Sequence, residues 1–129
     1  MKKKILLVED SASTQKLLYF ILSKEYDVFV TSNGYEAFLW LDQTKHIPDL
    51  IIMDWIMPYM DGRAFLKCIK VSGLYSEIPV IVLSSSRDVK EEVKVMSYTI
   101  SKTISKPFNP LELMESISEI FNIRYGIIN

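Results

Sequence analysis

The fold of this chain can be inferred from one segment, Leu50-Ile51-Ile52-Met53-Asp54-Trp55-Ile56-Met57-Pro58-Tyr59-Met60-Asp61-Gly62. Four apolar residues lead directly into Asp54, and a loop with Pro58 and an Asp-Gly turn follows. A continuous apolar run between such residues is typical of a strand that is buried on both faces of a parallel sheet. We therefore expect Asp54 at the carboxyl end of a central strand, where open α/β sheets bind their ligands. An aspartate that only ends a strand or caps a turn is the competing interpretation of this segment.

Apolar segments alternate with segments of helical periodicity along the rest of the chain. The expected strands are residues 5–8, 26–31, 50–54, 79–83 and 103–105. The expected helices begin after Ser11 or Ser13, after Gly34, at Gly62, at Asp88 and at Pro110, and Gly73 ends the third of them. This alternation predicts an α/β fold with a parallel sheet that is covered by helices on both faces.

The apolar face of each expected helix follows from the spacing of its large side chains. These faces are Leu17, Leu18, Phe20, Ile21 and Leu22; Ala37, Phe38, Trp40 and Leu41; Phe65, Leu66 and Ile69; Val89, Val93 and Met96; and Leu111, Met114, Ile117 and Ile120.

Length and composition restrict the class of protein. The chain has 129 residues, of which 49% are apolar, so we expect one domain over residues 1–123 and a short tail over 124–129. A net charge of -1 provides no basic surface for nucleic acid. Because no apolar run approaches ~20 residues and residues 5–8 are too short for a signal peptide, we expect a cytoplasmic protein.

The only cysteine and the only histidine are expected to be structural. A single cysteine, Cys68, excludes an internal disulfide framework, and we expect it to pack as a small apolar residue on a helix. His46 has no Cys or His neighbour that could complete a zinc site, so we expect it in a surface loop.

Polar side chains follow four of the expected strands. Glu9 and Asp10 follow the first strand, Asp54 the third, Ser84 the fourth and Lys106 the fifth. In a parallel sheet these ends meet at one edge, so the three carboxylates repel one another unless a cation lies among them. Because the ligands offer oxygen only, the expected cation is Mg2+.

A lysine and a hydroxyl that face such a carboxylate cluster form a site for a transferred phosphoryl group. Lys106 and the cation would neutralise its charge, and Ser84 would donate a hydrogen bond to it. Asp54 is then the expected nucleophile, and its product is an acyl phosphate.

The sequence resembles the receiver domain of two-component response regulators. The segments that carry the resemblance are Val8-Glu9-Asp10-Ser11, Asp54 with Met57-Pro58-Tyr59-Met60-Asp61-Gly62, Ile78-Pro79-Val80-Ile81-Val82-Leu83-Ser84, and Lys106-Pro107-Phe108. Each motif alone is weak, but the set, in this order and at these spacings, is highly specific, and it covers the chain up to about Ile120. The resemblance implies a flavodoxin-like three-layer (βα)5 fold with strand order 2-1-3-4-5.

The resemblance also implies the role of each site residue. Asp10 and Asp54 would bind Mg2+ directly, together with the backbone carbonyl of Ile56, and Glu9 would reach the metal through water. Asp54 would be the phosphorylated residue. Ser84 and Lys106 would be the conserved hydroxyl and lysine, and Pro107 would follow a peptide bond that is often cis.

Three positions depart from the pattern of the family. Thr103 stands where an aromatic switch residue is usual, and Thr99-Ile100 replaces the common Gly-Ala before the fifth strand. Ile56 is apolar and cannot position an attacking water. These departures concern the transmission of the signal rather than the phosphorylation chemistry, and they direct the expected output toward the fourth helix.

The resemblance implies a phosphorylation-activated switch that assists its own phosphotransfer and dephosphorylation but is not otherwise an enzyme. Its phosphoryl donor would be a sensor histidine kinase or a histidine phosphotransfer protein. Its downstream protein target would bind the face formed by helix 4, strand 5 and helix 5, with no nucleic acid or membrane bound by this chain alone.

Three alternatives stay open. The chain could be a receiver domain cut from a larger DNA-binding regulator or hybrid histidine kinase. A flavin or nucleotide binder of the same topology is disfavoured, because no Gly-rich loop follows the first strand. A receiver that no longer accepts phosphate is disfavoured by the complete set of Asp10, Asp54, Ser84 and Lys106.

Overall fold

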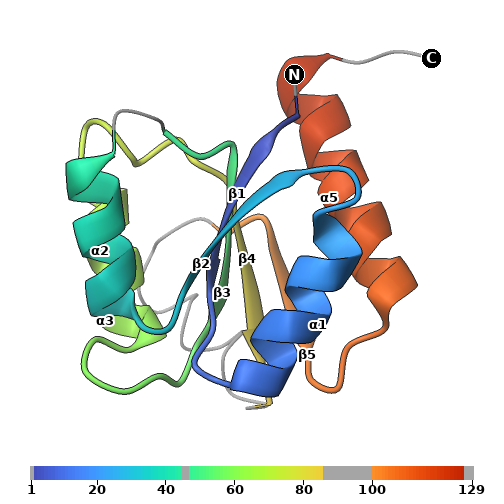
Figure 1. Cartoon of the computed structure of the whole chain (residues 1–129). Helices are drawn as coiled ribbons and strands as arrows, with labels where there is room; N and C mark the ends of the chain where they lie inside the picture. Colours follow the sequence, from blue (N-terminus) through green and yellow to red (C-terminus); the bar gives the residue numbers. More distant parts are fainter. Residues whose placement is uncertain (1, 45–46, 86–99, 127–129) are drawn as a thin grey trace.

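Five parallel strands form one sheet in the order β2-β1-β3-β4-β5 (Figure 1). The structure, a computed structural model, describes residues 2–44, 47–85 and 100–126. Its elements are β1 (Lys4–Val8), α1 (Ala12–Leu22), β2 (Asp27–Thr31), α2 (Gly34–Gln43), β3 (Leu50–Asp54), α3 (Gly62–Lys70), β4 (Val80–Ser84), β5 (Lys102–Ser105) and α5 (Pro110–Tyr125). The predicted α/β class and strand order are therefore confirmed. The predicted fourth helix and His46 lie outside the described residues.

Helices cover both faces of the sheet, with α1 and α5 on one face and α2 and α3 on the other (Figure 1). The central strands β1 and β3 alternate between two apolar clusters. Leu6 and Ile51 pack on the α2 and α3 side, whereas Ile5 and Ile52 pack on the α1 and α5 side. All five residues of β3 are buried, as its continuous apolar run predicts. The buried β3 strand carries Asp54 to the edge of the sheet.

Each described helix begins after a residue whose side chain caps it. Ser11, Asn33, Asp61 and Asn109 each accept a hydrogen bond from a backbone N–H of the first turn. Of the two serines that the sequence offers for α1, Ser11 is the cap. The Ser11 cap starts α1 directly after Asp10, and the Asp61 cap starts α3 at the end of the loop 55–61 that follows Asp54. Each cap therefore fixes one end of a loop beside the site.

Several predicted apolar positions are wrong. Leu17, Phe20, Phe38 and Leu111 are exposed, and so is Cys68, which was expected to be packed. At about 100° per residue, each of them lies outside the arc of the buried residues on its own helix. In addition, α3 ends at Lys70 with Val71 as its cap, before the predicted stop at Gly73.

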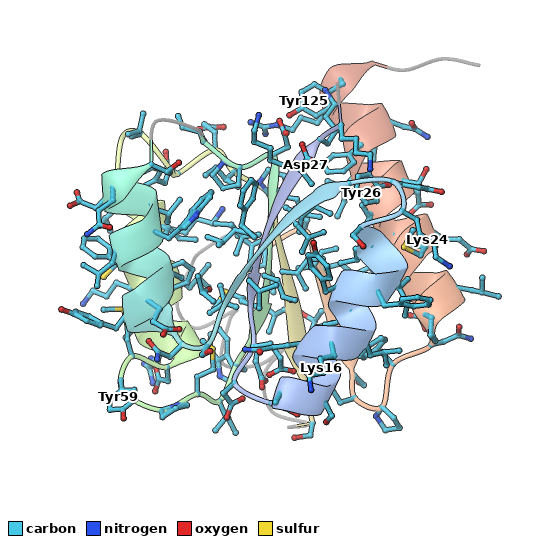
Figure 2. The ribbon with its side chains drawn as sticks, viewed as in Figure 1. Lys16, Lys24, Tyr26, Asp27, Tyr59 and Tyr125 are labelled. Carbon is cyan, nitrogen blue, oxygen red and sulfur yellow. The ribbon has the colours of Figure 1, made fainter. Side chains whose placement is uncertain are left out.

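The loop between β3 and α3 is held by two close backbone contacts. The N–H of Gly34 donates to the carbonyl of Met60 at 3.1 Å, and the N–H of Gly62 donates to the carbonyl of Trp55 at 2.8 Å. Between these contacts, Tyr59 adopts a φ of 65°, which is uncommon for a residue with a bulky side chain, and it points away from the protein (Figure 2). The backbone after Asp54 is therefore fixed at both ends.

The two ends of the described chain meet at the amino-terminal ends of the strands, on the side of the sheet far from Asp54. Asp49 accepts hydrogen bonds from the backbone N–H of Lys4 at 2.7 Å and from the hydroxyl of Tyr125. The ammonium of Lys3 lies 3.7 Å from the centre of the Tyr125 ring. Because Tyr125 belongs to α5, this helix continues two residues past the expected domain boundary at 123.

Gly62→Ala is expected to destabilise the fold. A Cβ at this position would lie 2.8 Å from the carbonyl oxygens of Asp54 and Trp55, and backbone cannot move as a flexible side chain does. Overpacking of this kind lowers the free energy of unfolding by about 1–3 kcal/mol, which urea denaturation would measure. Gly73→Ala is the matched control, because a Cβ there meets nothing within 4 Å. Equal free energies of unfolding for the two variants would contradict the steric argument.

Candidate functional site

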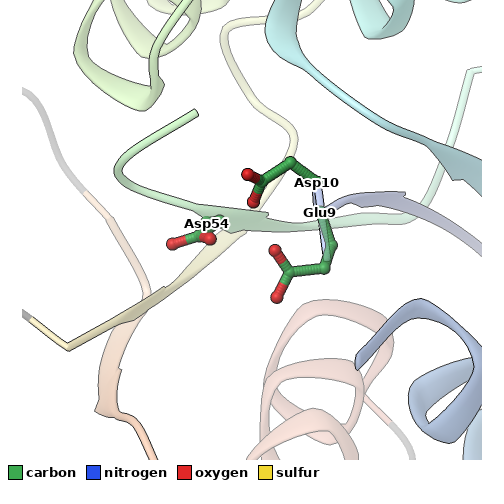
Figure 3. Close-up of side chains that lie close together, drawn as sticks. All are labelled: Glu9, Asp10 and Asp54. Carbon is green, nitrogen blue, oxygen red and sulfur yellow. The ribbon is translucent and has the colours of Figure 1, made fainter. Parts of the chain in front are cut away.

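Three carboxylates converge where β1 and β3 end (Figure 3). One oxygen each from Glu9, Asp10 and Asp54 lies within 4.8 Å of the other two. The strands bring them together because Val8 and Met53, the residues that precede them, are paired in the sheet. Glu9 and Asp54 are buried, and Asp10 is exposed. The predicted acidic cluster is therefore present, with one of its members open to solvent.

Lys106 reaches this cluster from the end of β5. Its ammonium donates to Glu9 Oε1 at 2.6 Å and to Asp54 Oδ2 at 3.0 Å, so one cation joins two strand ends. Its backbone N–H donates to the carbonyl of Ser84 at 2.9 Å, which fixes the start of the loop after β5. The Lys106–Pro107 peptide bond is cis, as the resemblance implied.

Each carboxylate oxygen of Asp54 accepts one hydrogen bond. Its Oδ1 accepts the backbone N–H of Trp55 at 2.8 Å, and its Oδ2 accepts the ammonium of Lys106. The N–H of Trp55 is also 3.2 Å from the carbonyl of Leu83 in the neighbouring strand β4. Only 9% of Asp54 is exposed. The carboxylate is therefore oriented, desolvated and next to a positive charge, which are the conditions that a carboxylate nucleophile requires.

The other predicted site residues lie in positions of different character. Ser84 is buried at the end of β4, directly after the residue that pairs with Asp54. The side chain of Ile56 is 65% exposed, so only its backbone could face the cluster. Thr103, at the position of the expected aromatic switch, lies within β5 opposite Val82. Thr99 lies outside the described residues.

Glu9 is the most strongly perturbed group of the site. Burial, opposed by the hydrogen bond from Lys106 and reinforced by Asp54, raises the pKa of Glu9 from 4.5 to about 7. Its Oε2 atom is buried and has no hydrogen-bond partner within the described part of the chain. Burial lowers the pKa of Lys106, but the hydrogen bonds to Glu9 and Asp54 outweigh this effect and raise it above 10.5. Either a cation or a bound proton would satisfy the Oε2 atom of Glu9.

The backbone of Glu9 is clamped by neighbours that the sequence reasoning missed. Its N–H donates to the carbonyl of Thr31 at 3.0 Å. The side-chain amide of Gln15 donates both to the carbonyl of Glu9 and to the hydroxyl of Ser32, the latter at 3.1 Å. The only feature of the sequence that could have indicated this contact was the position of Gln15 in the first turn of the helix that follows the strand. Gln15 thus connects α1 and the end of β2 to the acidic cluster.

The donor set fits Mg2+. All side-chain donors of the cluster are carboxylate oxygens, and the cluster contains a buried oxygen that no group in the described part of the chain satisfies. Hard divalent cations prefer such ligands, and Mg2+ retains several waters, which the exposed side of Asp10 permits. A cation there would also reduce the repulsion among the three carboxylates.

No helix in the described residues has both the length and the apolar character that a transmembrane span needs.

Comparisons with known proteins agree with the geometry. The chain is 30% identical to the sensor histidine kinase TmoS of Ectopseudomonas mendocina, over 94% of this chain and 12% of that protein. It is 29% identical to the phosphate regulon transcriptional regulatory protein PhoB of Escherichia coli K12, over 93% of this chain and 52% of that protein. The chain thus spans about half of one of these relatives and a much smaller part of the other.

Solved structures of receiver domains and response regulators also resemble this chain. The receiver domain of a signal transduction histidine kinase from Syntrophus aciditrophicus superposes with a TM-score of 0.82 at 33% identity, covering 93% of this chain and 90% of that one. The chemotaxis response regulator CheY4 of Vibrio cholerae superposes with a TM-score of 0.83 at 26% identity, covering 93% and 99%. The family model of the response regulator receiver domain matches residues 5–118. The fold, the acidic strand ends and this match together establish that the chain belongs to the response regulator receiver domain family.

Proposed function

We propose that this receiver domain is a phosphorylation-activated switch of a two-component phosphorelay and that Asp54 accepts the phosphoryl group from a phosphohistidine donor. The observation that carries the proposal is the contact between Asp54 and Lys106, whose ammonium lies 3.0 Å from the carboxylate. It holds a buried nucleophile beside a group that can bind the incoming phosphoryl oxygens. Glu9 and Asp10 complete the site as ligands for a cation.

The transfer exchanges one bond to phosphorus for another. A carboxylate oxygen of Asp54 bonds to phosphorus while the bond from phosphorus to the donor's histidine nitrogen breaks. The histidine keeps the electron pair of that bond and regains a proton from water, and Asp54 becomes an acyl phosphate. Lys106 then pairs with a phosphoryl oxygen, and the hydroxyl of Ser84 donates to another.

Asp10, Asp54 and the backbone carbonyl of Ile56 would hold Mg2+, with Glu9 reaching it through water. When bound, the cation neutralises negative charge on the phosphoryl oxygens. The protein's contribution is to position the carboxylates. The clamp on the backbone of Glu9 and the two fixed ends of the β3–α3 loop provide that positioning.

The donor would be a sensor histidine kinase or a histidine phosphotransfer protein in the cytoplasm. A downstream protein would bind the face of the fourth helix, β5 and α5, of which the structure describes β5 and α5. Curated relatives that include a kinase and a transcriptional regulator support a receiver that works beside other domains as well as one that works alone. The chemistry at Asp54 is the same in both arrangements.

Mg2+ is expected to change the fluorescence of Trp55. Its indole is buried, and its backbone N–H is bonded to the carboxylate of Asp54. A titration in a Trp40→Phe background isolates this signal and should saturate. The change should disappear in Asp10→Asn and in Asp54→Asn. Asp61→Asn is the matched control, since Asp61 caps α3 and lies outside the cluster. Equal Mg2+ affinity in all of these variants would refute the metal assignment.

A small acyl phosphate with Mg2+ is expected to add one phosphoryl group to the protein. Intact-mass spectrometry should detect the adduct, and borohydride reduction followed by peptide mapping should place it on Asp54. Asp54→Asn should remove the adduct, whereas Asp61→Asn should retain it. A stable adduct on Ser84 or Ser85 would be incompatible with the proposed nucleophile.

Glu9 is expected to make the stability of the metal-free protein depend on pH. Because its folded pKa is raised from 4.5 to about 7, its contribution is fully present below pH 4.5 and is lost as the pH rises through about 7. Across this range the wild type should lose up to about 3 kcal/mol of unfolding free energy relative to Glu9→Gln. Lys106 stays protonated throughout, so it adds no slope.

Urea denaturation of both proteins from pH 4 to pH 8 would measure this difference. Added Mg2+ should reduce it, because a bound cation favours the ionised carboxylate. Parallel pH profiles for wild type and Glu9→Gln would show that Glu9 has an ordinary pKa in the folded protein.

A further inference from the structure

Within the described residues, strand β2 forms an open edge of the sheet, because it pairs with β1 alone. The N–H of Asp27 donates to the carbonyl of Lys3, and the carbonyl of Thr31 accepts the N–H of Glu9. In a parallel ladder, alternate residues direct both backbone groups to the same neighbour. The backbone groups of Asp27, Phe29 and Thr31 therefore face β1, and those of Val28 and Val30 face outward.

This edge lacks most of the features with which proteins block edge pairing. The sequence Asp27-Val28-Phe29-Val30-Thr31 contains no proline and no basic residue, and its register with β1 is uninterrupted. Edges are usually protected by lysine, proline or a bulge. Val30 is 40% exposed even though it is β-branched and apolar. The strand therefore presents two N–H and two C=O groups beside apolar side chains.

The two flanks of β2 differ in character. On the α2 side, the Phe29 ring packs against Trp40, with 5.0 Å between the ring centres. On the α1 side lies a hollow of about 280 Å³ with a mixed lining of apolar, polar and charged residues: Lys2, Tyr19, Ser23, Tyr26, Asp27, Val28 and Phe29. Figure 1 shows β2 in front of the rest of the sheet, between α1 and α2, so a second strand can approach it from the open side.

We propose that β2 pairs with β2 of a second copy of this chain, antiparallel and about a twofold axis at Phe29. Val28 then lies opposite Val30 of the second copy, and each pair exchanges both of its outward N–H and C=O groups. Phe29 lies opposite itself, as a non-hydrogen-bonded pair requires in this register. A twofold axis uses the same patch on both copies and closes the assembly at a dimer.

The charges of the strand favour this register. Asp27, the only charged residue of β2, lies opposite Thr31 of the second copy, so no carboxylates face each other. The two Phe29–Trp40 pairs meet near the axis, where aromatic pairs across strands stabilise a sheet. A second copy satisfies all four outward backbone groups of both strands with one symmetric contact.

The antiparallel arrangement leaves the phosphorylation sites open. The carboxyl ends of the strands of the two copies point in opposite directions, so the two Asp54 side chains lie at opposite ends of the joined sheet. A phosphodonor can then approach either copy.

Sedimentation velocity and amide exchange by NMR test the proposal on the full chain over a range of concentrations. We expect a concentration-dependent dimer, in which exchange slows with concentration at the amides of Val28 and Val30. The amide of Phe29, which is bonded to β1, should be protected at every concentration. Val30→Pro removes an outward donor from each strand and should raise the Kd at least about tenfold. Val30→Thr keeps the donor and the β-branched shape, so it should dimerise as the wild type does.

Circular dichroism and phosphoryl labelling of Val30→Pro would test whether the variant is folded. A chain that stays monomeric at all concentrations with fast exchange at Val28 and Val30 overturns the proposal. A dimer that Val30→Pro leaves unchanged does the same. Protection of these amides only after a phosphodonor protein is added would assign the edge to that partner and likewise overturn self-pairing.

Discussion

The ammonium of Lys106 between Glu9 and Asp54 is the interaction on which the site depends. It joins the ends of β1, β3 and β5, and it places one positive charge among three carboxylates. One lysine cannot neutralise three carboxylates, and burial, reinforced by the neighbouring Asp54, raises the pKa of Glu9. The parallel sheet therefore holds its acidic residues in an arrangement that a divalent cation completes.

The loops after β1 and β3 are held by identifiable contacts. Helix caps at Ser11 and Asp61 begin helices within a few residues of the strand ends. The glycines at 34 and 62 allow backbone contacts that any side chain would block. Such preorganisation lets the phosphoryl group meet donors that are already in place, which lowers the cost of reorganisation during transfer. Ser84 ends β4 and Lys106 directly follows β5, so the proposed phosphorylation of Asp54 would act on the side chains at both strand ends.

The sheet and the acidic cluster could be predicted because both follow from local patterns. The apolar run before Asp54 determines a buried strand, and parallel strands bring their carboxyl ends together. The burial of individual helical residues could not be predicted in the same way. Leu17, Phe20, Leu111 and Cys68 are exposed because burial depends on how each helix is turned against the sheet. The clamp by Gln15 was missed because its partners are backbone and hydroxyl groups, which leave no pattern in the sequence.

The contacts of Tyr125 bring the two ends of the described chain close together, so the same fold could be built from a chain that begins at another residue. The hydroxyl of Tyr125 donates to Asp49, and its ring lies next to the ammonium of Lys3, so the start of β1 and the end of α5 lie side by side. A short linker could join these ends, and the chain could be opened at Gly73, which no other part of the described structure crowds. Such a circular permutant would keep every strand pairing of the sheet while changing which elements are synthesised first.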